Sequence, residues 1–227
     1  MIDFDLILAT GNPDKKAELV DALAHLVLPI IEPPYSLAPE ETGDTLFDNA
    51  LLKARAYAET FGIAALADDS GLEVDALGGA PGVYSARYGG TPPAGMTQYQ
   101  HNNAKILAAL ARSEQRTARF RCVIAVVAKG ADLERLTENE ARLPEGVRLV
   151  SLDDGWVVLA AEGTTEGVLL REAKGVAGFG YDPLFLSDEL GVTFAEASKE
   201  AKRAVSHRGK ALRRLIQALE FANLETA

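Results

Sequence analysis

Two adjacent aspartates, Asp68 and Asp69, follow the apolar run 63–67 and are followed by Ser70 and Gly71. Carboxylate oxygens beside a hydroxyl can hold a divalent metal next to a reacting group. The apolar run predicts a short buried strand that ends at the aspartates, and open α/β sheets bind ligands at strand ends. Because neighbouring strand side chains point to opposite faces, we expect only one of the two to face the ligand, and we expect Asp69, the one nearer the glycine. The same residue types are also typical of a simple exposed turn.

A second polar segment lies between an apolar stretch at 4–9, which predicts a strand, and residues 16–26, which have helical spacing. A loop that leads into a helix N-terminus can present backbone N–H groups and an ammonium to a phosphate. A turn with a helix-capping residue explains the segment equally well. The residues of this loop are Thr10, Gly11, Asn12, Pro13, Asp14 and Lys15.

An acidic loop at 39–45 precedes a region with helical periodicity at 45–61. Either Glu40 or Glu41 could join Asp69 in an oxygen site for Mg²⁺, which commonly takes one or two carboxylates plus phosphate oxygens. Acidic residues before a helix also complement its dipole, so the loop has an ordinary structural explanation as well.

Two later segments have residue types that could contact a ligand, a ring for a planar base in the first and hydrogen-bond donors for an acceptor oxygen in the second. In 178–183, Phe179 is flanked by glycines and could expose its ring for stacking, although a turn around a core phenylalanine fits too. In 199–210, Ser206 could cap the last helix and place His207 and Arg208 at its positive end. A solvated basic face is the alternative for this second segment.

The remaining pattern indicates a mixed α/β protein, with a β-sheet and helices around it. Helices are expected at 97–110 and at 198–221, the latter interrupted near 206–209. Strands are expected at 117–127, 148–161 and 163–172. The segments expected to lack regular structure are an extended connector at 29–39, a loop or hairpin at 78–93 and a surface excursion at 133–146.

Composition narrows the class of protein. The chain has 227 residues, of which 48% are apolar and 25% charged, as in a folded globular protein with one large domain or two lobes. Its net charge of -10 disfavours a general nucleic-acid binder. No apolar run is long enough to cross a bilayer and the N-terminus lacks a basic signal region, so we expect a cytoplasmic protein without membrane association. The single cysteine, Cys122, excludes an intrachain disulfide.

Taken in order, the polar segments resemble the inosine/xanthosine triphosphate pyrophosphatase family of house-cleaning enzymes. The resemblance spans nearly the whole chain and is far more specific than any one motif. Two stretches depart from the family pattern: 128–161 is longer than expected, and 91–96 is atypical. The matching pieces are Thr10–Asn12 with Lys15, 40–43, 49–50, 53–55, 67–72, 78–88, 120–122, 178–183 and 206–209.

The resemblance implies one nucleoside-triphosphate pyrophosphatase domain over residues 1–227, with two lobes around a long mixed sheet and the active site in the cleft between them. It implies Mg²⁺ as cofactor and a homodimer. The reaction is hydrolysis of ITP, dITP and XTP, deaminated purine nucleotides, to the monophosphate and pyrophosphate, which removes them from the nucleotide pool.

By the same resemblance, Asp69 is the general base and, with Glu40, a metal ligand. Phe179 stacks on the purine, while His207 and Arg208 donate to its 6-oxo group. How GTP is rejected is not evident from the sequence. The further residues assigned to substrate binding are Thr10, Gly11, Asn12, Pro13, Asp14, Lys15, Lys53 and Ser70 on the triphosphate, and Gly180, Tyr181, Asp182 and Lys202 around the base.

Two other functions remain open at this point. One is a related pyrophosphatase for pyrimidine or otherwise modified nucleotides. The other is a non-catalytic protein that binds nucleotides but does not hydrolyse them.

Overall fold

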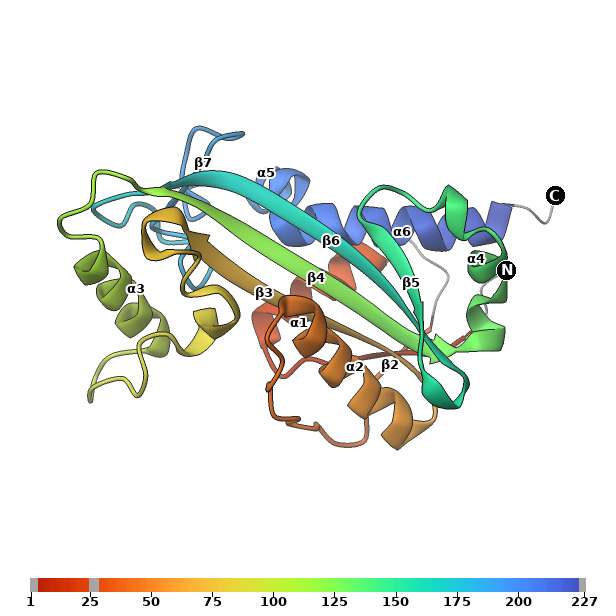
Figure 1. Ribbon diagram of the computed structural model, residues 1–227. Helices are drawn as coiled ribbons and strands as arrows, with labels where there is room; N and C mark the ends of the chain where they lie inside the picture. Colours follow the sequence, from red (N-terminus) through yellow and green to blue (C-terminus); the bar gives the residue numbers. More distant parts are fainter. Residues whose placement is uncertain (1–3, 25–28, 225–227) are drawn as a thin grey trace. The chain divides into compact units, whose positions relative to one another are not determined.

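A computed structural model describes residues 4–24 and 29–224 (Figure 1). Seven strands form one mixed sheet in the order β2-β1-β3-β4-β6-β5, with β7 paired to β6. Strand β1 is parallel to both β2 and β3, whereas β6 is antiparallel to both β5 and β7. The strands are β1 (Leu6–Leu8), β2 (Ile30–Ile31), β3 (Ala64–Val74), β4 (Thr117–Lys129), β5 (Val147–Ser151), β6 (Trp156–Leu169) and β7 (Phe185–Ser187).

The described residues also form six α-helices and several short 3₁₀ helices. The expected helix over 45–61 is confirmed as α2, and its start is fixed by a capping box in which Thr45 and Asp48 each bond the other's backbone N–H. The helix over 97–110 is confirmed in the same way as α3, with Thr97 as N-cap. The helices are α1 (Pro13–Leu23), α2 (Leu46–Phe61), α3 (Gln98–Ala109), α4 (Glu134–Glu138), α5 (Lys199–Val205) and α6 (His207–Leu224).

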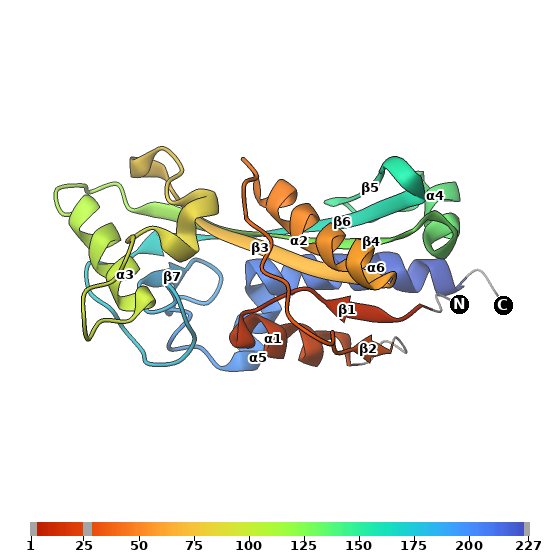
Figure 2. The same ribbon diagram turned by 90° about the horizontal axis from the view of Figure 1, so that it is seen from below.

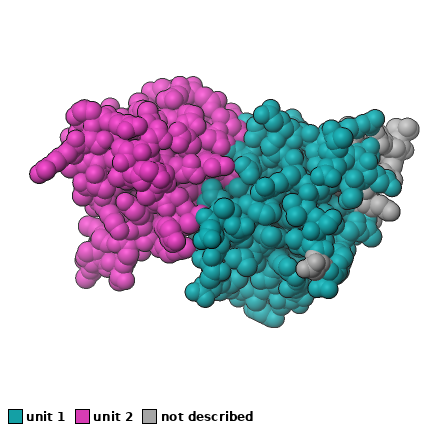
Figure 3. Space-filling model, in the orientation of Figure 1, with its two compact units in different colours: residues 1–69, 123–163, 211–227 teal, residues 70–122, 164–210 magenta. Residues whose placement is uncertain are grey.

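The chain divides into two compact units, coloured separately in Figure 3. Unit 1 comprises residues 1–69, 123–163 and 211–227, and unit 2 comprises residues 70–122 and 164–210. In unit 1, helix α2 covers one face of the sheet, and helices α1 and α6 cover the other (Figure 2). In unit 2, the core includes Leu72 on β3, Phe120 on β4, Ile106 on α3, Phe185 on β7 and Phe194 in the chain after β7.

The prediction that the strand ends at the two aspartates is wrong. Strand β3 continues for 11 residues through Asp68, Asp69 and Ser70 to Val74. Gly71 is not a turn residue: a Cβ placed there would lie 2.4 Å from the carbonyl oxygen of Gly82. The glycine is therefore required by close backbone approach, which is a known reason for glycine within a strand.

Several boundaries also differ from the predictions. The expected strand at 148–161 is a hairpin of β5 and β6, and the expected separate strand at 163–172 is the continuation of β6. The connector at 29–39 contains β2, and 133–146 contains α4 with the buried residues Leu133 and Leu136. Helix α1 begins at Pro13, earlier than expected, and its predicted extension to Leu26 lies outside the described residues.

The interruption predicted near 206–209 is confirmed, because α5 ends at Val205 and α6 begins at His207. Ser206 separates the two helices, and its Oγ accepts a hydrogen bond from the N–H of Gly209 at 3.1 Å. This is the capping role expected for it. In the part of the chain that the structure describes, no helix is sufficiently long and apolar to span a membrane.

Candidate active site

The loop between β1 and α1 forms a capped helix N-terminus. Oδ1 of Asn12 accepts hydrogen bonds from the N–H groups of Asp14 at 2.9 Å and Lys15 at 3.2 Å. Oγ1 of Thr10 accepts from the N–H of Asn12 at 3.2 Å, and Pro13 occupies the first helical turn. The capping arrangement is thus observed. It also leaves a positive helix end with N–H groups that an incoming phosphate oxygen could take over from Asn12.

The first aspartate is tied to this loop. The side chain of Asp68 is fully buried, and its Oδ2 lies 3.1 Å from Nζ of Lys15. Lys15 is the last residue of the predicted phosphate loop, so the ion pair joins that loop to β3. A buried carboxylate requires such a cation, because an unpaired buried charge is costly.

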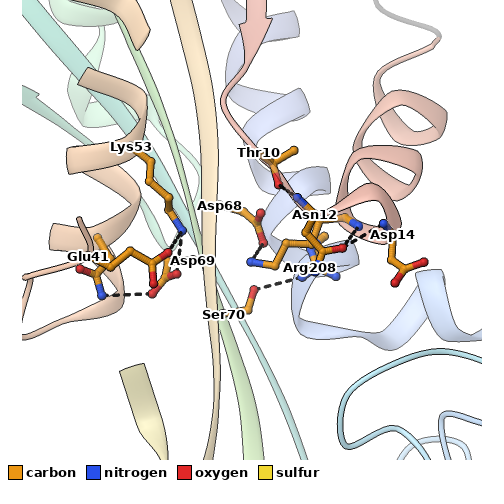
Figure 4. Close-up of polar contacts among 11 residues, drawn as sticks. Thr10, Asn12, Asp14, Glu41, Lys53, Asp68, Asp69, Ser70 and Arg208 are labelled. Carbon is orange, nitrogen blue, oxygen red and sulfur yellow. Dashed lines mark hydrogen bonds and ion pairs between the residues drawn. The ribbon is translucent and has the colours of Figure 1, made fainter. Parts of the chain in front are cut away.

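The second aspartate belongs to a different ion-pair cluster (Figure 4). Nζ of Lys53, on α2, lies 2.8 Å from Oδ1 of Asp69 and 2.9 Å from Oε1 of Glu41. The ammonium group of Lys53 thus forms ion pairs with the carboxylates of both Asp69 and Glu41. Glu40, the glutamate predicted as metal ligand, is exposed, and it is Glu41 that contacts Lys53.

Burial and charge act together on the pKa values in this cluster. Burial raises the pKa of Asp69 above the ordinary aspartate value, although the ammonium groups of Lys53 and Lys15 act to lower it. Burial acts to lower the pKa of Lys53, but the carboxylates of Asp69, Asp68 and Glu41 outweigh it and the pKa is raised. Lys53 therefore stays protonated, and Asp69 is a stronger base than an ordinary aspartate, as suits a proton acceptor.

Helix α2 presents three polar side chains to this site at intervals of four residues. Asn49 is completely buried; its Oδ1 accepts from the N–H of Gly43 at 2.8 Å, and its Nδ2 makes a long contact of 3.5 Å with Oδ2 of Asp69. Lys53 follows one turn later. After one more turn, the hydroxyl of Tyr57 accepts from the N–H of Leu37 at 2.8 Å. The i, i+4, i+8 spacing puts all three on one face, so α2 anchors the acidic loop at both of its ends.

Sequence reasoning missed this role of Asn49 and Tyr57. The signal available for it was their spacing from Lys53 on a helix that was already expected. In the sequence, Asn49 was named only within the matching stretch 49–50, and Tyr57 only as part of the helical periodicity at 45–61.

In unit 2, the segment 178–183 folds around Asp182. Its Oδ2 accepts from Nζ of Lys202 at 2.6 Å and from the N–H of Phe179 at 2.9 Å. Gly178 has a φ of 72°, and a Cβ there would lie 2.1 Å from Oδ2 of Asp182, so only glycine fits. Asp182 and Lys202, both predicted to lie along the edge of the base, thus contact each other within this unit.

The ring of Phe179 is partly exposed and has cationic groups near it. Nζ of Lys202 lies 5.1 Å, and Cζ of Arg208 lies 5.8 Å, from its centroid. Tyr181 points elsewhere: it is buried in the core, and its hydroxyl donates to the carbonyl of Ser85 at 2.9 Å. Burial raises the pKa of Tyr181, so this hydroxyl remains a neutral donor.

His207 and Arg208 are both buried at the start of α6, at 5% and 3% exposure. The imidazole of His207 stacks on Phe120 with ring centroids 4.7 Å apart and an angle of 12° between the planes. Nη2 of Arg208 lies 3.3 Å from Oγ of Ser70, the residue that follows Asp69 on β3. Two donor side chains are therefore held in fixed positions within unit 2, as required for recognition of an acceptor atom.

The predicted residues thus fall into two sets, one in each unit. The loop Thr10–Lys15, Lys53 and Asp69 belong to unit 1, while Ser70 and the residues of 178–183, 202 and 207–208 belong to unit 2. The division falls between consecutive residues of β3. Across residues 4–24 and 29–224, no three His, Cys, Asp or Glu side chains form a ready metal-binding cluster.

The first parallel strand of the mixed sheet leads into a helix N-terminus, and two carboxylates on the neighbouring strand pair with lysines from helices. This arrangement is typical of the class of phosphate-binding α/β proteins. Comparison with known proteins narrows this class. The model of the Ham1 family matches residues 6–218, and the chain belongs to this family. The resemblance stated from the sequence is confirmed.

The relatives carry consistent names. A "dITP/XTP pyrophosphatase" of Desulforamulus reducens is 47% identical over 219 residues, covering 94% of each chain. A protein of the same name from Yersinia pestis is 42% identical, covering 96% of this chain and 98% of its own.

Solved structures agree with the fold described above. A HAM1 protein from Coxiella burnetii, 36% identical, superposes with a TM-score of 0.74 and covers 96% of this chain and 98% of its own. A nucleoside-triphosphatase / dITP/XTP pyrophosphatase from Mycobacterium abscessus, also 36% identical, gives a TM-score of 0.65 and covers 93% and 98%. The predicted mixed α/β class, with helices flanking a mixed sheet, is confirmed.

Proposed function

We propose that this protein hydrolyses deaminated purine nucleoside triphosphates, namely ITP, dITP and XTP, to the monophosphate and pyrophosphate in a Mg²⁺-dependent reaction. The observation that carries the proposal is the Asp69–Lys53–Glu41 cluster in a chain of the Ham1 family. Asp69 follows Asp68 on β3, and the ion pair of Asp68 with Lys15 ties this strand to a capped helix N-terminus. The relatives' shared name supports the substrate class.

The donor set fits a hard divalent cation. Asp69 and Glu41 are brought to within 2.8 and 2.9 Å of one ammonium, so two carboxylates already face a common positive charge. Mg²⁺ typically takes one or two carboxylates together with phosphate oxygens and water. We therefore propose Glu41, in place of the predicted Glu40, as the partner of Asp69. The bound ion would neutralise phosphate charge and make a bound water more acidic.

The chain's own residues have separate tasks in this proposal. Asp69, with its raised pKa, accepts the proton of the attacking water. Lys53 keeps that carboxylate oriented through the contact at Oδ1, and Lys15 and the α1 N-terminus bind the triphosphate. Water adds across the anhydride between the α- and β-phosphates, and pyrophosphate leaves.

Base recognition is assigned to unit 2. Phe179 stacks on the purine, Asp182 and Lys202 lie along its edge, and His207 and Arg208 donate to the 6-oxo group. Adenine presents an amino donor at that position, which would leave a buried donor unpaired at a cost of about 1–3 kcal/mol. This explains discrimination against ATP.

The homodimer and the cytoplasmic location implied by the family resemblance are part of the proposal. So is the single domain with a cleft between two lobes. Analytical ultracentrifugation of the purified protein tests the dimer directly.

The function is tested by a substrate panel with and without Mg²⁺. We expect ITP, dITP and XTP to release monophosphate and pyrophosphate much faster than ATP or GTP, and only with the metal. Orthophosphate as the direct product, or equal rates on all purine triphosphates, would contradict it. Preferential hydrolysis of pyrimidine nucleotides would favour the related pyrophosphatase, and binding without turnover would favour the non-catalytic alternative.

A further inference from the structure

Helix α3 has no assigned role in the proposed reaction, yet two of its side chains reach the segment 178–183, called here the base loop. Nδ2 of Asn103 donates to the carbonyl of Gly180 at 3.1 Å. The ring of Tyr99, one turn earlier on the same helix face, lies 6.1 Å from the ring of Phe179 with an angle of 39°. All of these residues belong to unit 2.

The backbone around Phe179 needs contacts from outside residues 178–180 to fix its conformation. Phe179 stands between Gly178 and Gly180, whose φ values are 72° and 64°. Glycine has the greatest backbone freedom of any residue, so a phenylalanine flanked by two glycines is not held by its own backbone. The N–H of Phe179 is held by Asp182, and the carbonyl of Gly180 by Asn103. These two bonds enclose the Phe179–Gly180 peptide on both sides.

The other bonds of the base loop act farther from the aromatic ring. Lys202 holds Asp182, and Ser85 holds the hydroxyl of Tyr181. The bond from Asn103 is the one made to the residue that directly follows Phe179.

A second observation marks Asn103 as an unusual helix residue. Its Oδ1 is buried and has no hydrogen-bond partner among the described residues. A buried unsatisfied acceptor is destabilising, and each such group in a folded protein calls for an explanation. A leucine or alanine at this position would avoid the cost, but neither could hold Gly180.

We propose that Asn103 is a positioning residue for base recognition: it fixes the Gly180 carbonyl, and thereby holds Phe179, backed by Tyr99, in the stacking orientation. This proposal rests on the assignment of Phe179 to the base. Asn103 acts on binding of the purine and leaves the Asp69 cluster, in unit 1, unchanged.

The test uses two variants of the full-length protein. Asn103→Ala removes the amide, and Asn103→Asp keeps its shape but replaces the donor by an oxygen that cannot donate to Gly180. For both we expect KM for ITP to rise roughly three- to tenfold, the effect of losing one hydrogen bond, with kcat changed less than twofold. Asn103→Gln, which retains a donor, should recover part of the loss.

A matched control separates positioning from stability. Gln100→Ala removes the α3 capping-box side chain that accepts from the N–H of Thr97 at 2.9 Å, without touching the base loop. We expect it to lower the melting temperature at least as much as Asn103→Ala while leaving KM unchanged. An equal rise in KM for Gln100→Ala would overturn the proposal.

Hydrogen exchange measured by mass spectrometry gives a readout that does not depend on activity. Peptides covering 178–183 should exchange faster in both Asn103→Ala and Asn103→Asp than in the wild type or Gln100→Ala. Unchanged exchange in this peptide, or wild-type KM in both Asn103 variants, would overturn the proposal. A wild type that does not hydrolyse ITP would instead contradict the proposed function, and exchange would still report whether Asn103 holds the loop.

Discussion

Asp68 and Asp69 are consecutive residues of β3, yet they pair with different lysines on opposite faces of the strand (Figure 4). Asp68 contacts Lys15, at the start of α1, and Asp69 contacts Lys53, on α2. The two helices cover opposite faces of the sheet in unit 1 (Figure 2). One strand segment thus contacts the capped loop before α1 on one face and the acidic loop before α2 on the other, the two loops proposed to bind phosphate and metal.

This division predicts different consequences for two otherwise identical substitutions. Asp69→Asn should lower kcat by about 10²- to 10⁴-fold, because the proton acceptor is lost, while nucleotide binding persists. Asp68→Asn should mainly raise KM, because Lys15 loses its partner. Steady-state kinetics on ITP and direct nucleotide binding by calorimetry distinguish them. The same loss of kcat in both variants would show that the pair acts as a unit.

The pKa of Asp69 can be measured in the metal-free protein. Burial raises it above the ordinary value of 3.8, so the carboxylate takes up its proton at a higher pH than an exposed aspartate does as the pH falls. Lys53 acts to lower this pKa, so Lys53→Met should raise it further. Carbon-detected NMR titration of the aspartate carboxyl groups tests both statements. A lower pKa in Lys53→Met would mean that the ammonium does not act on Asp69 as the structure indicates.

The choice between the two glutamates has a direct test. Glu41→Gln should weaken Mn²⁺ binding, followed by electron paramagnetic resonance, and should raise the Mg²⁺ concentration needed for activity. Loss of a group that only orients a metal ligand typically costs about 10- to 100-fold in metal affinity, so at least that effect is expected for a direct ligand. Glu40→Gln, at the exposed neighbouring position, is the matched control. If Glu40→Gln has the larger effect, the original sequence prediction is right.

Gly11 and Gly71 differ in the space that is available for a methyl group. Gly71→Ala would bring a Cβ within 2.4 Å of the Gly82 carbonyl oxygen, so the free energy of unfolding should fall by about 1–3 kcal/mol. Gly11→Ala meets nothing within 4 Å and should leave that free energy nearly unchanged. Urea unfolding of both proteins measures the difference. Equal stabilities would mean that β3 and the segment at Gly82 can separate without cost.

Much of this site was predictable because local rules dominate there. Side-chain alternation along a strand separated Asp68 from Asp69, and the capping residue Ser206 marked a helix start correctly. These features depend on residues close in sequence. Residue type and spacing are therefore sufficient to find them.

The parts that could not be predicted depend on contacts between distant segments. A strand seemed to end at Asp68 because charged residues disfavour buried strands, but lysines from two helices neutralise both carboxylates and let β3 continue. In the same way, Glu41 rather than Glu40 meets Lys53 because Tyr57 and Asn49 fix the acidic loop at Leu37 and Gly43. No pattern of residues close in sequence shows which of the two glutamates contacts Lys53.

Asn49 provides the last prediction, since it connects the acidic loop to Asp69. Asn49→Leu keeps a similar volume but leaves the N–H of Gly43 without its acceptor, at a cost of about 1–3 kcal/mol in the free energy of unfolding. Turnover of ITP should also fall, because both Glu41 and Asp69 lose a fixed neighbour. The control is Glu59→Gln on the same helix, which breaks only a surface ion pair with Arg55 and should cost less than about 0.5 kcal/mol. Unfolding in urea and kinetics on the same samples test the two effects. If Asn49→Leu loses stability but keeps full turnover, the acidic loop does not depend on α2 for its catalytic position.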